Sequence, residues 1–192
     1  MIHYFPYLKQ NIGLNRVSDS ILRKMLSYAK VRTFSPKENL VGDGVESGRI
    51  YFIVKGIVKG LFTHLEEQVC SRLYKAGDVV SDYSSLEINQ HNAYHVECVG
   101  YVTALYLDRE DFYHLMEEQT GLKQLYLENL SNEIYKYELR VRGLLCYSAK
   151  ERYLKFVEYF GEYISCLSQK DIASYLAMKP ETLSRIKKSL NG

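Results

Sequence analysis

The spacing of apolar residues along the chain changes twice. Between about residues 14 and 30 it follows the helical period, at Leu14, Val17, Ile21, Leu22, Met25 and Leu26. This spacing predicts a short amphipathic helix. Between about residues 31 and 107, short apolar and β-branched segments alternate with glycine and aspartate, which predicts short antiparallel strands forming a roll or barrel. After Asp108 the helical period returns, so the expected fold class is α+β.

One segment of the predicted roll is apolar at almost every position. Residues 50–54 read IYFIV, as expected of a central strand whose two faces are both covered. Gly56 and Gly60 follow it and are expected at bends or bulges.

Two helices are expected directly after the roll. Asp108 is placed to cap a helix that continues to Glu118, with acidic residues in its first turn, where the helix dipole favours negative charge. The pair Thr120-Gly121 interrupts this helix, and a second one is expected to run to about Tyr147.

The second of these helices carries apolar residues in an a/d heptad pattern. The residues are Leu127, Leu130, Ile134, Tyr137, Val141 and Leu144. This seam favours pairing with another helix, and it is equally typical of a helix that packs on its own domain. The spacing alone does not separate the two interpretations.

The last segment of the chain predicts two short helices joined by a tight turn. Ser168 followed three residues later by Asp171 forms a capping box. Pro180 is favoured at the first position of a helix, so a new helix is expected to begin there after a turn of about three residues. This pair of helices is a helix-turn-helix whose second helix can enter a major groove. Each polar residue on it also has a structural interpretation: Glu181 and Arg185 are spaced for a surface ion pair.

Composition narrows the class of protein without identifying a partner. The chain has 192 residues, of which 46% are apolar and 25% are charged, the balance of a globular protein. Its net charge is only +2, so any basic site must be local. Residues 148–192 hold eight basic against five acidic side chains, a mildly basic tail.

Several classes of site and location are not expected. No apolar run approaches the ~18 to 20 residues of a membrane span, and the first residues lack the features of a signal peptide, so a cytoplasmic protein is expected. The cysteines form no closely spaced pair and are expected to be partly buried thiols rather than metal ligands. They are Cys70, Cys98, Cys146 and Cys166. No Gly-rich phosphate loop, metal-ligand spacing or catalytic constellation is present, so an enzyme is not expected.

The order of the predicted elements resembles that of the Crp/Fnr family of bacterial transcription regulators: a roll, then a long helix, then two short helices. Residues 50–58 (IYFIVKGIV) and 75–80 (KAGDVV) are similar to that family's cyclic-nucleotide-binding-type sensor domain. Residues 172–176 (IASYL) and 180–186 (PETLSRI) are similar to its helix-turn-helix. The resemblance covers nearly the whole chain.

The resemblance implies three parts. Residues 1–119 would be a cyclic-nucleotide-binding-like antiparallel β-roll (a double-stranded β-helix), residues 120–147 a dimerisation helix containing the heptad seam, and residues 148–192 a helix-turn-helix DNA-binding domain. A homodimer would hold two recognition helices about 34 Å apart over a pseudo-palindrome in double-stranded DNA. RNA polymerase is a further expected partner.

The same resemblance assigns roles on the second helix. Glu181 and Arg185 match the positions that contact base edges: Arg can bind guanine with two hydrogen bonds, and Glu can accept one from cytosine. Contacts with the DNA backbone are expected from Lys170, Thr182, Lys187 and Lys188.

The sensor site departs from the family pattern. Members that bind cyclic AMP carry a Gly-Glu-Leu and an Arg that meets the cyclic phosphate. The corresponding positions here are Ser81, Asp82, Tyr83, Asn92 and Ala93. No Arg or Lys lies between Lys75 and Arg109, so a phosphate would lack its charge-assisted partner. Cyclic AMP is therefore not expected to bind, no cofactor is expected, and the effector is left open.

The predicted helix-turn-helix also departs from the family pattern. Ala177 occupies the position of the turn glycine, where a left-handed conformation would cost roughly 1 kcal/mol. Family members usually continue into a β-hairpin wing after the second helix, whereas this sequence ends at Gly192. Without a full wing, Lys150, Arg152 and Lys155 would have to supply more of the backbone contacts. The alternative function is a ligand- or redox-sensing module that acts through protein contacts without binding DNA.

Overall fold

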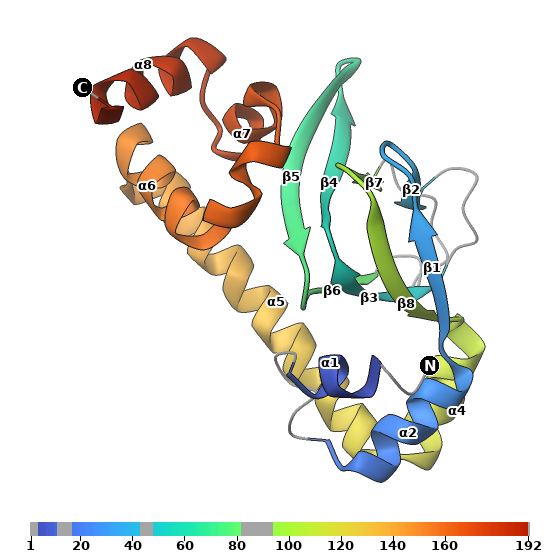
Figure 1. Cartoon of the computed structure of the whole chain (residues 1–192). Coiled ribbons are helices and arrows are strands. Elements are labelled where there is room, and N and C mark those ends of the chain that lie inside the picture. The colour runs from blue at the N-terminus through green and yellow to red at the C-terminus, as the bar shows by residue number, and fades with distance from the viewer. Residues whose placement is uncertain (1–3, 11–16, 43–47, 82–93, 192) are drawn as a thin grey trace.

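The computed structural model describes residues 4–10, 17–42, 48–81 and 94–191. Its centre is a roll of two four-stranded antiparallel sheets, with helices at both ends (Figure 1). The first sheet has the order β1-β8-β3-β6, formed by Lys30–Phe34, Val102–Leu107, Ile50–Lys55 and Val79–Ser81. The second has the order β2-β7-β4-β5, formed by Asn39–Val41, Tyr94–Cys98, Ile57–His64 and Glu67–Lys75.

Strand β3 shows why its sequence is apolar at nearly every position. It lies between β8 and β6, with neighbours on both sides. Tyr51 and Ile53 point into the roll, where they pack with residues of the second sheet. Ile50 and Phe52 alternate to the other face and pack against helices. Because both faces are buried, no polar position remains, and the prediction of a central strand is confirmed.

The glycines after β3 take the predicted roles. Gly56 has φ +98 in the turn to β4, a conformation that L side chains rarely adopt. At Gly60 the register of β4 with β5 shifts, which marks a bulge. A Cβ on Gly60 would also collide with the phenol of Tyr94.

Helices cover the outer face of the first sheet. These are α1 (Phe5–Gln10), α2 (Asp19–Tyr28), α4 (Arg109–Glu118) and the start of α5 (Thr120–Cys146). Helix α2 begins at Asp19, where the hydroxyl of Ser18 caps its N-terminus, and Leu14 of the predicted helix lies outside the described residues. Asp108 precedes α4 without capping it, which corrects the predicted cap. Its carboxylate instead accepts hydrogen bonds from Lys30 and from Nε of Arg49, the latter at 2.8 Å.

The remaining helices cover the outer face of the second sheet. They are α6 (Ala149–Phe160), the 3₁₀ helix η3 (Gly161–Cys166), α7 (Gln169–Tyr175) and α8 (Pro180–Asn191). Their apolar side chains share a core with Ile57 and Leu61 of β4 and with Cys70 and Leu73 of β5. Helix α5 connects the two ends of the molecule (Figure 1).

Among the described residues, no helix combines the length and the apolar character that crossing a membrane would need.

Candidate nucleic-acid interface and sensor roll

Helices α7 and α8 meet at a tight turn. The hydroxyl of Ser168 accepts a hydrogen bond from the backbone N–H of Asp171 at 3.0 Å, so the predicted cap of α7 is present. Pro180 is the first residue of α8, also as predicted. Between the helices, the N–H of Met178 donates to the carbonyl of Ala173 at 3.0 Å, which closes the end of α7.

Ala177 adopts the left-handed conformation. Its φ is +49, in the region where a Cβ crowds the backbone. The turn therefore holds a strained residue at a position that glycine would occupy without strain.

Helix α8 has one buried face and one exposed face. Leu183 is completely buried, and Ile186 packs beside it, whereas Leu190 is 40% exposed. Glu181, Arg185 and Lys188 are exposed on the other side, with Thr182 half-buried. Nη2 of Arg185 lies 3.5 Å from Oγ1 of Thr182. Glu181 and Arg185, both described, form no ion pair, so the structural interpretation of their spacing is not realised.

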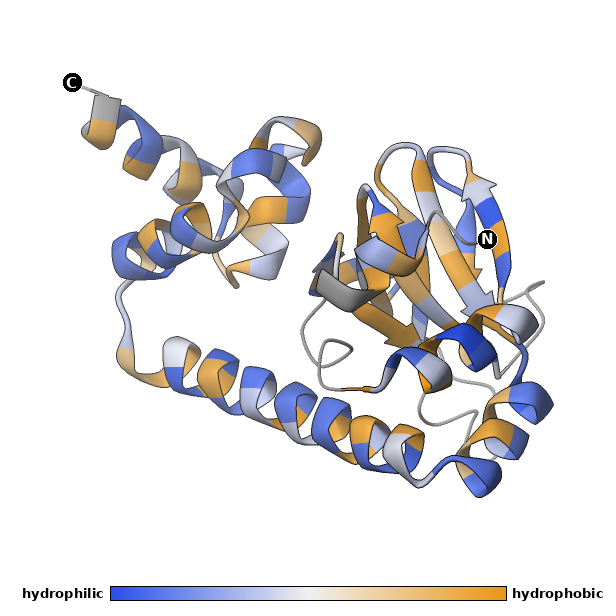
Figure 2. Ribbon diagram, turned by 60° about the horizontal axis from the view of Figure 1, so that its bottom comes forward, coloured by the Kyte–Doolittle hydropathy of each residue, from blue (hydrophilic) through white to orange (hydrophobic). Residues whose placement is uncertain are grey.

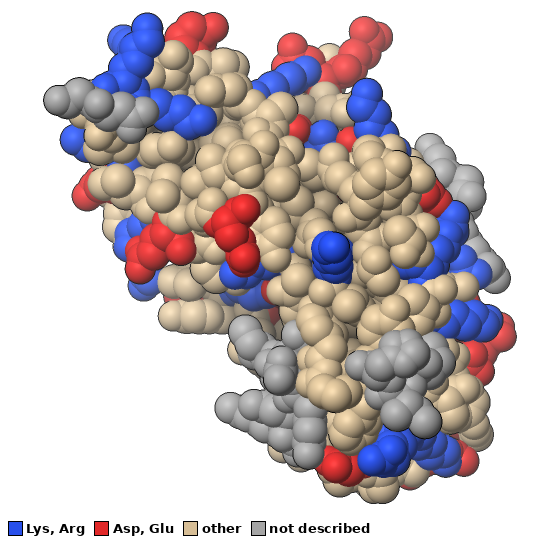
Figure 3. Space-filling model, in the orientation of Figure 1, with Lys and Arg blue, Asp and Glu red and all other residues tan. Residues whose placement is uncertain are grey.

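The basic residues predicted to contact the DNA backbone lie on α7 and α8. Lys170 and Lys188 are exposed and Lys187 is half-buried. Figure 3 shows Lys and Arg side chains over the end of the molecule that α8 forms. Lys150 and Lys155, on α6, are exposed too.

Arg152 does not have the role expected of it. Instead of projecting into solvent, its guanidinium donates to three backbone carbonyls, those of Tyr147 at 2.8 Å, Leu176 at 3.0 Å and Ala177 at 3.3 Å. These contacts leave it unsuited to a phosphate, because three of its five N–H groups are already used.

The predicted seam of α5 is mostly uncovered. Ile134 is 68% exposed and Leu127 and Val141 are more than half exposed. Tyr137 and Leu144 are exposed to a smaller degree, and Leu130 is half-buried. Hydrophobic positions recur along the ribbon of α5 in Figure 2. Packing on its own domain therefore does not account for this stripe.

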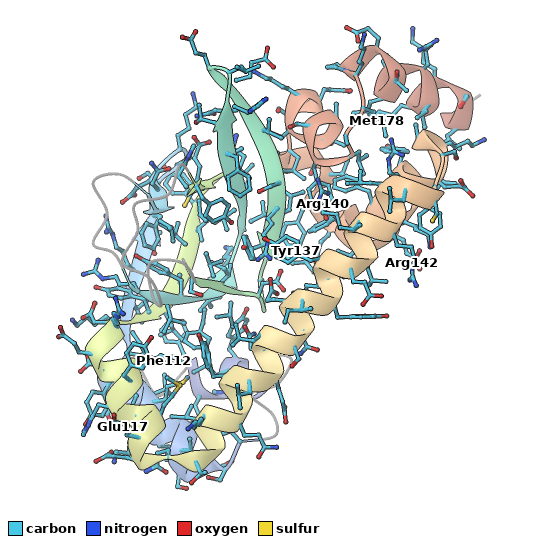
Figure 4. The ribbon with its side chains drawn as sticks, turned by 180° about the vertical axis from the view of Figure 1, so that it is seen from behind. Phe112, Glu117, Tyr137, Arg140, Arg142 and Met178 are labelled. Atoms are coloured by element: carbon cyan, nitrogen blue, oxygen red, sulfur yellow. The ribbon has the colours of Figure 1, made fainter. Side chains whose placement is uncertain are left out.

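The side of α5 that faces the roll carries polar groups and one residue of the seam, Tyr137. Nη1 of Arg72, on β5, donates to Oε2 of Glu133 at 2.8 Å, and Glu133 is only 6% exposed. The ring of Tyr137 lies 3.6 Å from the same guanidinium. Figure 4 shows Tyr137 and Arg140 on the side of α5 that faces β5, and Arg142 on the opposite side.

This polar network extends into the roll. The hydroxyl of Tyr74 accepts from Arg72 at 2.8 Å and lies 3.1 Å from the hydroxyl of Tyr94. Burial raises the pKa of both phenols, so both are neutral. Burial also disfavours the charge of Lys136, but Asp78 and Glu133, at 3.0 and 2.9 Å, outweigh it and raise the pKa of Lys136. Sequence reasoning missed this network, since no spacing relates β5 to α5.

Helix α7 is attached directly to the second sheet. Nζ of Lys59, on β4, lies 3.1 Å from carboxylate oxygens of both Glu97 and Asp171. The hydroxyl of Ser174 accepts a hydrogen bond from the backbone N–H of Cys70 at 2.8 Å. Burial at this contact raises the pKa of Cys70 to about 12, so its thiol is unreactive.

The four cysteines differ in burial. Cys70 and Cys98 are buried, and Cys146 and Cys166 are exposed, so the expectation of four partly buried thiols is wrong. The described residues contain no group of His, Cys, Asp and Glu arranged to hold a metal ion.

Only one residue of the predicted sensor cassette can be placed. Ser81 ends β6 opposite Ile50 and is buried. The other four, Asp82, Tyr83, Asn92 and Ala93, lie outside the described residues. The guanidinium of Arg72 lies close to the roll interior, and it is already engaged by Tyr74 and Glu133. The predicted departure of this cassette from the family pattern therefore stays a prediction.

Comparisons with known proteins agree with this geometry. Residues 31–119 match the family model of the cyclic nucleotide-binding domain. A search of curated protein sequences finds no match. Among solved structures, FixK2 from Bradyrhizobium japonicum superposes with a TM-score of 0.73 at 18% identity, covering 85% of this chain and 84% of FixK2.

Two further structures are similar over most of their length. One is the c-di-GMP responsive global regulator CLP of Xanthomonas campestris, with a TM-score of 0.68 at 12% identity, covering 91% of this chain and 92% of CLP. The other is the catabolite activator protein of Thermus thermophilus, with a TM-score of 0.57 at 18% identity, covering 96% and 86%. At these identities the likeness shows a shared fold: an antiparallel roll of the cyclic nucleotide-binding type, followed by helices.

Proposed function

We propose that this chain is a DNA-binding transcription regulator of the Crp/Fnr type, acting as a homodimer on a pseudo-palindromic site in the cytoplasm. One observation carries the proposal: the chain leaves uncovered both the apolar stripe of α5 and the polar face of α8. The first fits a second copy of the chain, and the second fits a major groove.

The structural neighbours support this function. They are regulators of the Crp/Fnr type, and CLP is described as linking cell–cell signalling to virulence gene expression. In the proposed organisation, residues 1–119 are the sensor, residues 120–147 the dimerisation helix and residues 148–192 the DNA-binding unit. RNA polymerase is the proposed protein partner, and no step requires enzymatic chemistry.

The exposed face of α8 supplies the proposed contacts. Glu181 and Arg185 read base edges, and Thr182, Lys187, Lys188 and, from α7, Lys170 hold the backbone. Pairing along α5 would use Leu127, Leu130, Ile134, Tyr137, Val141 and Leu144.

The test begins with selection of a preferred duplex from random DNA, which should yield a pseudo-palindrome. Arg185→Ala should weaken binding to that site by about 1–3 kcal/mol and relax preference at one base pair. Lys188→Ala is the matched control on the same face. It should weaken specific and random DNA equally and reduce the salt slope by about 0.9, as loss of one phosphate contact does. Fluorescence anisotropy at several salt concentrations measures both.

A flat selection with no enriched sequence would contradict the proposal and favour the alternative, a sensing module that acts through protein contacts. Deletion of residues 168–192 is not a clean test, because Ile172, Ala173, Leu176 and Leu183 belong to the core shared with β4 and β5. Substitution of both Glu181 and Arg185, which are exposed, leaves that core intact.

Cyclic AMP is not the proposed effector. The chain from residue 76 to residue 108 contains no Arg or Lys, and Arg72 is engaged by Glu133 and Tyr74. Without a cation, the cyclic phosphate lacks its strongest hydrogen bonds. Calorimetric titration with cyclic AMP and cyclic GMP should show no saturable binding in the micromolar range; saturation there would contradict this part of the proposal.

A further inference from the structure

Arg152 joins three parts of the chain that sequence separates. It lies on α6 and is half-buried. Its Nη1 donates to the carbonyl of Tyr147, the C-cap residue directly after α5. Its Nε and Nη2 donate to the carbonyls of Leu176 and Ala177, in the turn between α7 and α8. The side chain of Arg152 thus contacts both the end of α5 and the turn between α7 and α8.

The acceptors are groups that need such a donor. The last carbonyls of a helix have no partner within that helix, and Tyr147 and Leu176 each follow a helix C-terminus. Positive charge is favoured at this end of a helix. Ala177, the third acceptor, has the strained φ of +49. The planar guanidinium reaches the three carbonyls from three different nitrogens in a fixed fork, whereas an ammonium group would have to offer all its donors from one nitrogen.

We propose that Arg152 is a positioning residue that fixes the orientation of α8 relative to α5, and thereby the spacing of half-sites that a dimer accepts. The inference rests on the proposed function for its biological meaning. Its structural part stands alone, because the three hydrogen bonds lie within one chain. Half-site spacing follows from the separation of two recognition helices about the two-fold axis, so a looser link at Arg152 makes that separation variable.

The first experiment measures binding to the selected site and to versions with one base pair added or removed between the half-sites. Wild type should discriminate against the altered spacings. Arg152→Gln should lose this discrimination and weaken binding to the optimal site about tenfold, because the recognition helices would then have to be ordered when the protein binds. Its affinity for random DNA should stay within about twofold, because no phosphate contact is removed. Lys150→Gln, an exposed charge on the same helix, is the control and should keep the spacing preference.

Two outcomes of that experiment would overturn the inference. Equal weakening on specific and random DNA, with a smaller salt slope, would make Arg152 a phosphate contact. Restoration of the spacing preference in the double variant Arg152→Gln with Ala177→Gly would show that Arg152 only relieves the strain at Ala177. If Arg152→Gln does not fold, Arg152→Lys retains the charge while losing the planar fork, and it is expected to give the same loss of spacing preference.

The second experiment needs no DNA. Spin labels are placed at Asn132→Cys on α5 and Lys188→Cys on α8, both exposed, in a chain carrying Cys146→Ser and Cys166→Ser. Labelled chain is diluted with unlabelled chain, so that only the distance within one chain is measured by double electron–electron resonance. The distribution should be narrow with Arg152 and clearly broader with Arg152→Gln. An unchanged width would overturn the inference, whereas a narrow-to-broad change in a protein that fails to bind DNA would reject only the proposed function.

Discussion

Helix α5 and the helical unit α6–α8 both carry apolar residues at helical spacing, and the fold treats them differently. In α6–α8, Phe156, Phe160, Ile172 and Leu183 are buried against β4 and β5. In α5, Leu122 is the apolar side chain that is fully covered, and the heptad residues after it are exposed or half-exposed. The two segments are adjacent in the chain and similar in composition, so sequence pattern alone does not distinguish them.

The difference shows what the pattern means in each place. An apolar stripe that the chain buries within itself stabilises the tertiary fold, and its loss lowers the free energy of unfolding. A stripe that folding leaves exposed adds little to the free energy of unfolding of the single chain, and it is typical of a surface that contacts another chain. The following substitutions separate these two contributions.

The largest effect is expected at the buried stripe. Phe156→Ala removes a ring that is 3% exposed and packs against Phe160 and Tyr175. It should lower the free energy of unfolding by about 3–5 kcal/mol, measured by urea denaturation. Leu154→Ala, on the same helix but 45% exposed, is the control and should cost less than about 1 kcal/mol. Equal effects at the two positions would mean that α6 does not pack on the roll as described.

The next effect is expected at the exposed stripe. Ile134→Glu places a charge in the middle of the heptad seam of each copy, where pairing would bury it. It should weaken homodimer association about 100-fold, equivalent to ~2.7 kcal/mol, in sedimentation experiments over a range of concentrations. The circular dichroism of the separated chain should not change. Leu139→Glu, exposed on α5 outside the seam, should leave association within about threefold, since surface substitutions rarely exceed about 0.5 kcal/mol.

The smallest effect is expected in the turn between α7 and α8. Ala177→Gly removes the strain of the left-handed conformation and should stabilise the fold by about 0.5–1 kcal/mol. The gain is limited because glycine loses more conformational entropy on folding than alanine does. Thermal unfolding measures the gain. The dimer should be unaffected, since Ala177 lies outside α5. A lower unfolding temperature would show that the turn is not left-handed at this position.

Local rules explain what sequence predicted well. Ser168, Pro180, Gly56 and Ala177 each act within a few residues of their own position, and the alternation in β3 reflects two covered faces. Side chains that act at long range were not predictable in the same way. Arg152 was expected to face DNA and instead binds backbone carbonyls, two of them 24 and 25 residues away. Asp108 was expected to cap a helix and instead pairs with Lys30 and Arg49.

The candidate nucleic-acid interface shows the same distinction between local and long-range interactions. Leu183 and Ile186 define the covered side of α8, and Glu181, Arg185 and Lys188 are exposed away from it. Spacing gave no indication that Glu133 would meet Arg72, or Lys59 meet Asp171, since these pairs join separate elements of the chain. The roles of Glu181 and Arg185 in reading DNA stay predictions.

Strand β4 separates the inside of the roll from the helical unit by the thickness of a single sheet. Val58 points inward, while Ile57, Lys59 and Leu61 meet the outer helices. A shift in the tilt of this strand would therefore act directly on the ion pair between Lys59 and Asp171 of α7 and on the apolar core that the strand shares with the helices. In this arrangement one layer of backbone lies between the interior of the roll and the helices α7 and α8.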